Sequence, residues 1–119
     1  MQKYSKTKHE PESCTMSRLA IQDTLEIVNG KWKLVILMTL LHRSFRFKEL
    51  VREIGISPRM LSRELQDMEG QQLISRTVLD TRPVSVEYAI TKYGMSFSEV
   101  LEAMRIWGMK HRNKMIHNQ

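Results

Sequence analysis

The 119-residue chain contains a single cysteine, Cys14, and its four histidines are scattered. A single thiol excludes both an internal disulfide framework and a cysteine-based zinc site. The histidines also lack the spacing that metal ligands usually show. We therefore expect neither a structural metal nor a cofactor.

The sequence also lacks the features of membrane proteins, secreted proteins and common enzymes. No apolar run approaches the roughly 20 residues that a membrane-spanning helix needs. The polar start, residues 1–13, has no apolar segment of the kind found in secretory signals. There is no glycine-rich phosphate loop, HExxH sequence or carboxylate pair, and the histidine nearest to Cys14, His9, lies in a segment expected to be disordered. These absences favour a cytoplasmic protein that is not an enzyme and does not contact a membrane.

Positive charge is in excess: the formal net charge is +6 and the isoelectric point is about 9.7. Such an excess favours a polyanionic partner, nucleic acid above all. A basic surface without any such partner has the same composition. The positions of the cations must therefore decide between the two interpretations.

Apolar periodicity predicts several helices and a pair of alternating strands. The helices are expected at residues 16–28, 31–42, 47–54, 58–71 and from 92 onward, a short strand at 43–46, and the alternating strands at 73–79 and 84–90. Gly55 is expected to end the third helix, and Ser57 and Pro58 to begin the next as N-cap and first residue. The predicted fold class is mainly α with a small antiparallel β-hairpin (α+β), arranged as a winged helix-turn-helix.

The helix expected at 58–71 has two chemically different faces. Its apolar residues Leu61, Leu65 and Met68 share one face. The opposite side carries Arg59, Arg63 and Gln66, and Ser62 lies at its edge. Arginine suits the O6 and N7 atoms of guanine, and glutamine suits the N6 and N7 atoms of adenine. A phosphate contact or a merely solvated face is the alternative, but the preceding helix and turn favour DNA reading.

Further cations are expected to support this contact. Arg82 lies at the tip of the hairpin, where Pro83 restricts its backbone, and an exposed arginine at such a tip can enter a narrow minor groove. An ordinary surface turn is the other interpretation. Lys31, Arg46 and Lys48 lie near predicted helix starts or the short strand and could reach phosphates, although a solvated surface charge is the favoured interpretation for each. Ser57, at the start of the second helix, is a further candidate for DNA contact. The candidate DNA-binding set is Arg59, Ser62, Arg63, Gln66, Arg82, Ser57, Lys31 and Arg46.

Several short motifs, taken in order, resemble the HxlR-type winged-helix transcriptional regulators of bacteria. They are Gly30-Lys31-Trp32, Arg46-Phe47-Lys48-Glu49-Leu50, residues 55–62, Leu73-Ile74-Ser75-Arg76, Val86-Glu87-Tyr88, Thr91-Lys92-Tyr93-Gly94 and Trp107-Gly108. Two positions depart from the family pattern. Thr15 follows Cys14 where the family often has proline, and Gln72 precedes Leu73 where it usually has glycine.

The resemblance implies a homodimer that binds a palindromic operator in double-stranded DNA through two identical reading heads. It places the dimer interface on the N-terminal and C-terminal helices, with Leu19, Leu25, Phe97, Leu101, Met104 and Trp107 as candidates. A long amphipathic final helix also needs a partner to cover its apolar side. The expected organisation is a flexible arm at 1–15, a DNA-binding and dimerisation domain at 16–109, and a basic tail at 110–119.

The resemblance also suggests what the regulator responds to. In several members of the family the N-terminal cysteine reacts with oxidants or electrophiles, and Cys14 occupies the matching position. The positive end of a helix favours the thiolate, which is the reactive form of cysteine. An inert thiol, with a small-molecule inducer acting elsewhere, remains an alternative. A winged helix that binds protein or RNA is a further one, and Arg59 and Arg63 disfavour its protein-binding version.

Overall fold

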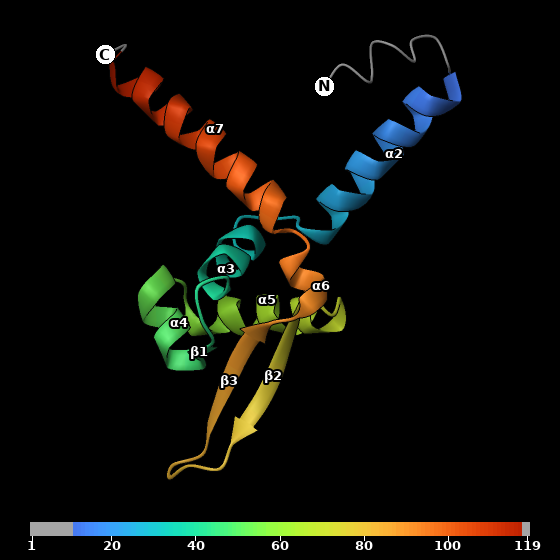
Figure 1. Cartoon of the computed structure of the whole chain (residues 1–119). Helices are drawn as coiled ribbons and strands as arrows, with labels where there is room; N and C mark the ends of the chain where they lie inside the picture. Colours follow the sequence, from blue (N-terminus) through green and yellow to red (C-terminus); the bar gives the residue numbers. More distant parts are fainter. Residues whose placement is uncertain (1–10, 118–119) are drawn as a thin grey trace. The chain divides into compact units, whose positions relative to one another are not determined.

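The computed structural model of the chain describes residues 11–117 and contains helices together with one small sheet (Figure 1). The chain divides into two compact units, Met1–Gly30 and Lys31–Gln119. None of the helices within residues 11–117 combines the length and the apolar character needed to cross a bilayer.

The first unit consists of one helix, α2 (Pro11–Ile27). The helix was predicted to begin at residue 16, but it begins at Pro11, since proline is well suited to a first helical turn. Residues 11–15 of the predicted arm are therefore helical, and residues 1–10 of that arm lie outside the described part of the chain. The exposed apolar side chains of α2 include Met16, Leu19, Ile21 and Leu25.

The second unit begins with α3 (Lys33–Leu40), β1 (Phe45–Arg46), α4 (Phe47–Ile54) and α5 (Pro58–Gly70). It continues with β2 (Ile74–Leu79), β3 (Ser85–Ile90), α6 (Lys92–Met95) and α7 (Ser98–His117). The sheet is antiparallel, with strand order β1-β3-β2. This element order and topology confirm the predicted winged helix-turn-helix class.

The turn between α4 and α5 follows the sequence prediction closely. Gly55 caps α4 in the left-handed conformation with φ of 77°, which glycine adopts without steric cost. Ile56 is buried in the turn. The Ser57 hydroxyl then accepts a hydrogen bond from the backbone N–H of Met60 at 3.2 Å, and Pro58 is the first residue of α5. Together these residues fix the direction in which α5 leaves the turn.

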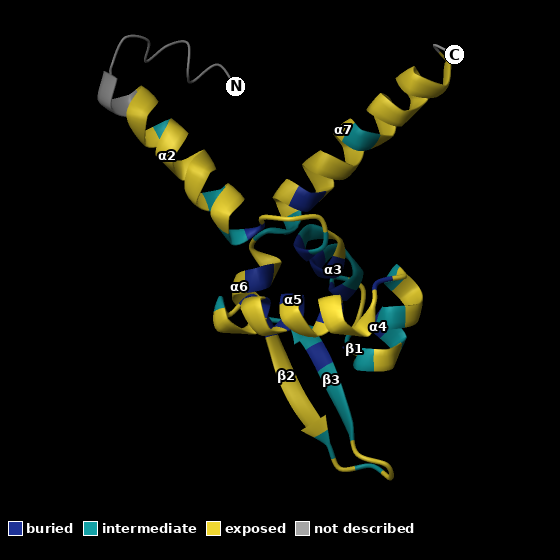
Figure 2. Cartoon of the chain, turned by 180° about the vertical axis from the view of Figure 1, so that it is seen from behind, coloured by how far each residue is buried: buried dark blue, intermediate teal, exposed yellow. Residues whose placement is uncertain are grey.

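The core lies where α3, α4, α5 and the start of the hairpin meet. Its fully buried side chains are Ile36, Leu37, Leu40, Leu50, Leu61, Leu65, Met68 and Ile74. Figure 2 shows that burial fades along the hairpin toward its tip. The far half of the hairpin, called the wing below (residues 77–86), therefore extends beyond the core, and its valines Val78 and Val84 are exposed.

The C-terminal helix differs from the prediction of one helix after Thr91, because the chain forms short α6 and then long α7. The Thr91 hydroxyl donates to the Leu73 carbonyl at 3.0 Å and accepts from the Gly94 N–H at 2.9 Å, so α6 is tied to the hairpin base. A Cβ atom at Gly94 would lie 2.3 Å from the Leu73 carbonyl oxygen. Gly94 and Ser96 are poor helix formers, and α6 ends between them at Met95, before α7 begins at Ser98.

Two further boundaries differ from expectation. The structure starts α3 at Lys33 rather than residue 31, with Trp32 as N-cap, and ends it at Leu40. Residues 110–117 of the predicted tail continue α7 as helix, which reaches His117.

Candidate nucleic-acid interface

The outer face of α5 carries the predicted reading residues. Leu61, Leu65 and Met68 are buried beneath the helix, as the periodicity predicted. On the opposite side the structure exposes the four predicted polar residues, Arg59, Ser62, Arg63 and Gln66. The helix therefore presents two guanidinium groups, a hydroxyl and a carboxamide on a surface braced by the core. Groups of this kind can form paired hydrogen bonds with base edges.

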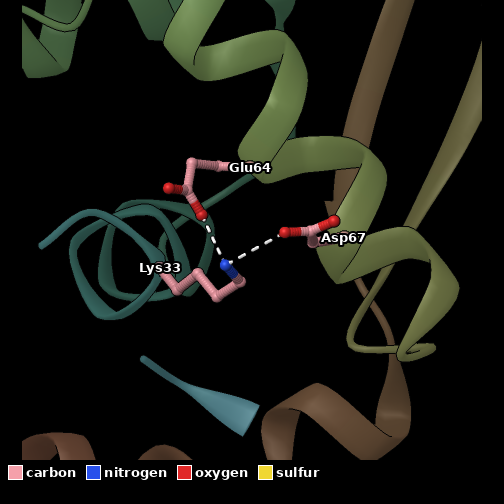
Figure 3. A network of polar contacts seen from close by, with 3 residues as sticks. All are labelled: Lys33, Glu64 and Asp67. Atoms are coloured by element: carbon pink, nitrogen blue, oxygen red, sulfur yellow. Dashed lines mark hydrogen bonds and ion pairs between the residues drawn. The ribbon is translucent and has the colours of Figure 1, made fainter. Parts of the chain in front are cut away.

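A buried ion pair holds the inner side of α5 against α3. The Lys33 Nζ atom lies 2.6 Å from Glu64 Oε1 and 3.3 Å from Asp67 Oδ2 (Figure 3). Lys33 is 4% exposed and Glu64 is 8% exposed. This pair was not predicted. A lysine within the apolar segment 32–41, and an acid next to Leu65 on the inner face of α5, were the available signals.

Opposing effects act on the Lys33 ammonium. Burial favours its neutral form and would lower its pKa. The hydrogen bonds and negative charges of Glu64 and Asp67 more than offset that effect, so the pKa of Lys33 lies above its ordinary value. Lys33 is therefore a charged group that ties α5 to α3.

The wing places Arg82 at the exposed loop between β2 and β3. The Thr81 hydroxyl donates a hydrogen bond to the Pro83 carbonyl at 2.8 Å and lies 3.3 Å from the Ser85 hydroxyl. The side chain of Thr81 thus braces the loop from within. Arg82 is left at the tip, as the sequence predicted.

A further cation, Arg76, lies between the wing and α5, and sequence reasoning did not select it. Arg76 pairs across the sheet with Tyr88, and both line a recess together with Ser62, Gln66 and Glu69. The strand alternation was the available signal, because it puts Arg76 on the same sheet face as the buried Ile74. A cation on that face lies next to α5.

Arg46, at the start of α4, lines a groove together with Arg82 of the wing. The neighbouring Glu49 accepts a hydrogen bond from the Arg46 backbone N–H at 2.8 Å, and its carboxylate lies 3.5 Å from the Arg43 guanidinium. The backbone hydrogen bond is the main reason that the pKa of Glu49 lies below its usual value, and the charge of Arg43 adds to it.

The other predicted contacts are more dispersed. The Ser57 hydroxyl is used as the cap of α5, although the residue remains exposed. Lys31 lies in the turn before α3, where its ammonium is 4.8 Å from the centre of the Trp32 ring. The structure thus gathers the four α5 residues on one face and brings Arg46 and Arg82 to one groove, while Lys31 contacts an aromatic ring.

The predicted dimer residues separate into two groups. Leu19 and Leu25 on α2, and Met104 and Trp107 on α7, are exposed, and Phe97 is half-buried. Trp107 is 65% exposed and stacks on His111 with ring centres 5.1 Å apart. Leu101 is different, because at 3% exposed it packs within its own chain and has almost no surface left for a partner. Leu101 is therefore a core residue that anchors α7, and not an interface residue as predicted.

Cys14 is exposed and lies in the first turn of α2, rather than just before the helix as predicted. The earlier start of α2 at Pro11 accounts for this difference. Within residues 14–117, no cluster of three or more histidine, cysteine, aspartate or glutamate side chains has the arrangement of a metal site.

Comparisons with known proteins agree with this architecture. The family model described as HxlR-like helix-turn-helix matches residues 27–116. The HTH-type transcriptional regulator YtcD of Bacillus subtilis is 37% identical over 98 residues, which cover 82% of this chain and 78% of YtcD. A crystal structure of a ytcD regulator superposes with a TM-score of 0.74 at 38% identity, covering 78% of this chain and 96% of that one.

Two other solved structures carry redox descriptions. The redox regulator HypR in its reduced form has a TM-score of 0.75 at 28% identity, covering 82% of this chain and 98% of HypR. The reduced form of the transcriptional regulator YodB from B. subtilis has a TM-score of 0.67 at 29% identity, covering 74% of this chain and 87% of YodB.

Proposed function

This chain belongs to the HxlR-like helix-turn-helix family of transcriptional regulators, and on that premise we propose that it binds a palindromic operator in double-stranded DNA as a homodimer. Such a protein works in the cytoplasm, where bacterial DNA is found, and has no catalytic step of its own.

The outer face of α5 carries this proposal. Arg59, Arg63 and Gln66 project from a helix whose other side is fixed by core leucines and by the Lys33–Glu64 pair. A helix held in place loses less conformational freedom on binding than a mobile one. In the major groove, Arg63 and Arg59 would each reach guanine, and Gln66 would reach adenine. Arg82 on the wing would enter the neighbouring minor groove.

A dimer supplies two such faces to one operator. Its half-sites would lie about one helical turn, ~34 Å, apart. Exposed apolar residues on α2, among them Leu19 and Leu25, and on α7, among them Met104 and Trp107, are the residues that a second copy would cover. The operator itself can be isolated by selecting protein-bound duplexes from a random pool.

Replacing Trp107 with aspartate should yield a monomer, because a charge would be placed within the proposed apolar interface. Binding to the operator should then weaken by roughly tenfold or more, because a monomer contacts only one half-site and loses the gain from binding both at once. Sedimentation velocity measures the mass, and a gel-shift titration measures the affinity. Tyr93→Asp, which changes an exposed aromatic residue on α6, is the matched control and should remain dimeric. A dimeric Trp107→Asp protein would contradict the proposed interface.

Oxidant sensing through Cys14 is the second part of the proposal. Its support is the exposure of Cys14, its place in the first turn of α2, and the redox descriptions of the similar proteins HypR and YodB. The chain has no second cysteine, so a disulfide must join Cys14 to a small thiol or to a partner chain. Such a modification next to the dimer helices would change the spacing of the two reading faces.

Replacing Cys14 with serine should abolish release from the operator by diamide, because serine has no thiol to oxidise. Operator affinity under reducing conditions should stay unchanged, since Cys14 lies outside the reading face. The gel shift is measured with diamide, and again after dithiothreitol is added. If Cys14→Ser is released by diamide as readily as the original chain, release does not depend on Cys14 and the sensing proposal is wrong.

A further inference from the structure

A groove of about 530 Å³ lies between the start of α4 and the wing. Its size falls in the range of pockets that hold small organic molecules. The groove is built entirely within the second unit, from residues 46–49 and 52 on one side and 81–86 on the other.

Cations converge on this groove from both sides. Arg46, Lys48 and Arg52 come from the α4 side, and Arg82 comes from the wing. Glu49 is the one acidic residue among those that line it, and its carboxylate already accepts from the Arg46 backbone and faces Arg43. Four cations against one engaged carboxylate leave the groove positive, and therefore suited to an anion.

The surface between these cations is mainly apolar. It is formed by Phe47 at the start of α4 and by Pro83, Val84 and Val86 on the wing. Val84 is 65% exposed, so its side chain contributes little to the core of the protein. A DNA phosphate strand would match the cations but would leave these apolar groups in contact with charge and water. Their presence indicates an occupant with an apolar body as well as a negative charge.

We propose that this groove binds a small aromatic carboxylate. The ring would lie against Phe47, Val84 and Val86, and the carboxylate would face the guanidinium groups of Arg52 and Arg82, which suit planar carboxylates. Ligand binding of this kind does not depend on DNA binding. Its consequence does rest on the proposed function: Arg46 and Arg82 would serve both ligand and DNA, so a bound ligand would weaken operator binding.

The test uses 2-naphthoate as the probe and the full-length chain without DNA, with heat of binding measured by titration calorimetry. We expect one molecule to bind per chain. The uncharged amide, 2-naphthamide, should bind at least roughly tenfold more weakly, since that factor corresponds to the loss of one charge-assisted contact. Equal affinity for the acid and the amide, or no heat from 2-naphthoate in the millimolar range, would overturn the proposal.

Variants locate the site. Arg52→Gln and Val84→Ser should each weaken 2-naphthoate binding by roughly fivefold or more, because one removes a charge and the other an apolar contact. Arg112→Gln on α7 and Val78→Ser, an exposed valine of the wing that does not line the groove, are matched controls and should bind normally. All four positions are exposed, and circular dichroism checks that each variant is folded. Normal binding by Val84→Ser places the ligand elsewhere and refutes the proposal.

Operator affinity separates this proposal from the proposed function. The operator affinity measured without 2-naphthoate reports on DNA binding alone. The operator affinity measured with saturating 2-naphthoate should be lower. If Lys48→Gln and Arg52→Gln weaken operator binding while 2-naphthoate does not bind, the groove is a track for the DNA backbone and the ligand proposal is wrong.

Discussion

Replacing Lys33 with methionine should destabilise the fold by about 3 kcal/mol, the range expected when one partner of a buried ion pair is removed. The substitution leaves the Glu64 carboxylate buried without the ammonium that lies 2.6 Å from it. Asp67 contributes less to the loss, because its side chain is largely in water and the contact is longer. Urea unfolding followed by circular dichroism measures the free energy of unfolding.

A second variant separates the lost pair from the lost lysine. Lys33→Met combined with Glu64→Met removes both charges and keeps apolar volume, so it should recover most of the stability. Lys110→Met, the same change at an exposed position on α7, should alter stability by less than about 0.5 kcal/mol. If Lys33→Met costs no more than Lys110→Met, the pair does not hold α3 to α5.

The pH dependence of stability has a defined sign. The pKa of Lys33 is raised in the folded protein, so its contribution is complete below the ordinary lysine pKa of about 10.4 and is lost as the pH rises through the folded value. The unfolding free energy of the original chain should therefore fall relative to that of the doubly substituted variant above that pH. An unchanged difference between them would show that folding leaves the Lys33 pKa unaltered.

Replacing Arg63 with alanine should weaken operator binding by roughly 10- to 100-fold, the cost of losing one paired contact to a base. The side chain is exposed on the outer face of α5, opposite the buried Leu61 and Leu65. Its removal should therefore leave folding intact. Gel-shift titrations against the operator, against operators with single base changes, and against a random duplex measure affinity and specificity together.

The pattern across sequences identifies what Arg63 contacts. A base contact predicts lost preference at one position in each half-site, with little change toward the random duplex. A phosphate contact predicts an equal loss of affinity for every sequence. It also predicts that the slope of affinity against salt concentration falls by about one released counterion. Arg112→Ala on α7 is the matched control and should bind the operator normally. Unchanged specificity in the Arg63→Ala protein would show that Arg63 does not contact the bases.

The local elements were predictable where neighbouring residues alone determine them. The α4–α5 turn depends on Gly55, Ser57 and Pro58, each of which has a conformational preference that acts within a few residues. The buried face of α5 follows in the same way from the spacing of its apolar residues. The fold class and the outer polar face of α5 could therefore be predicted without a structure.

The features that the sequence did not reveal depend on contacts between distant segments. Lys33 and Glu64 are 31 positions apart, so neither residue by itself indicates a buried pair. The bond that ties Thr91, at the start of α6, to Leu73 joins residues 18 positions apart, and the burial of Leu101 depends on the packing of α7. The groove between α4 and the wing likewise needs both segments in place, since its cations come from residues 46–52 and from Arg82.

Selection of bound duplexes from a fully random pool tests most directly whether the outer face of α5 reads DNA sequence. The purified chain should enrich one inverted repeat whose half-site centres lie about one helical turn apart. The same selection with the Arg63→Ala protein should lose a base preference at the same position in both halves. Enrichment of no sequence above the starting pool would contradict the claim that this protein recognises an operator through α5.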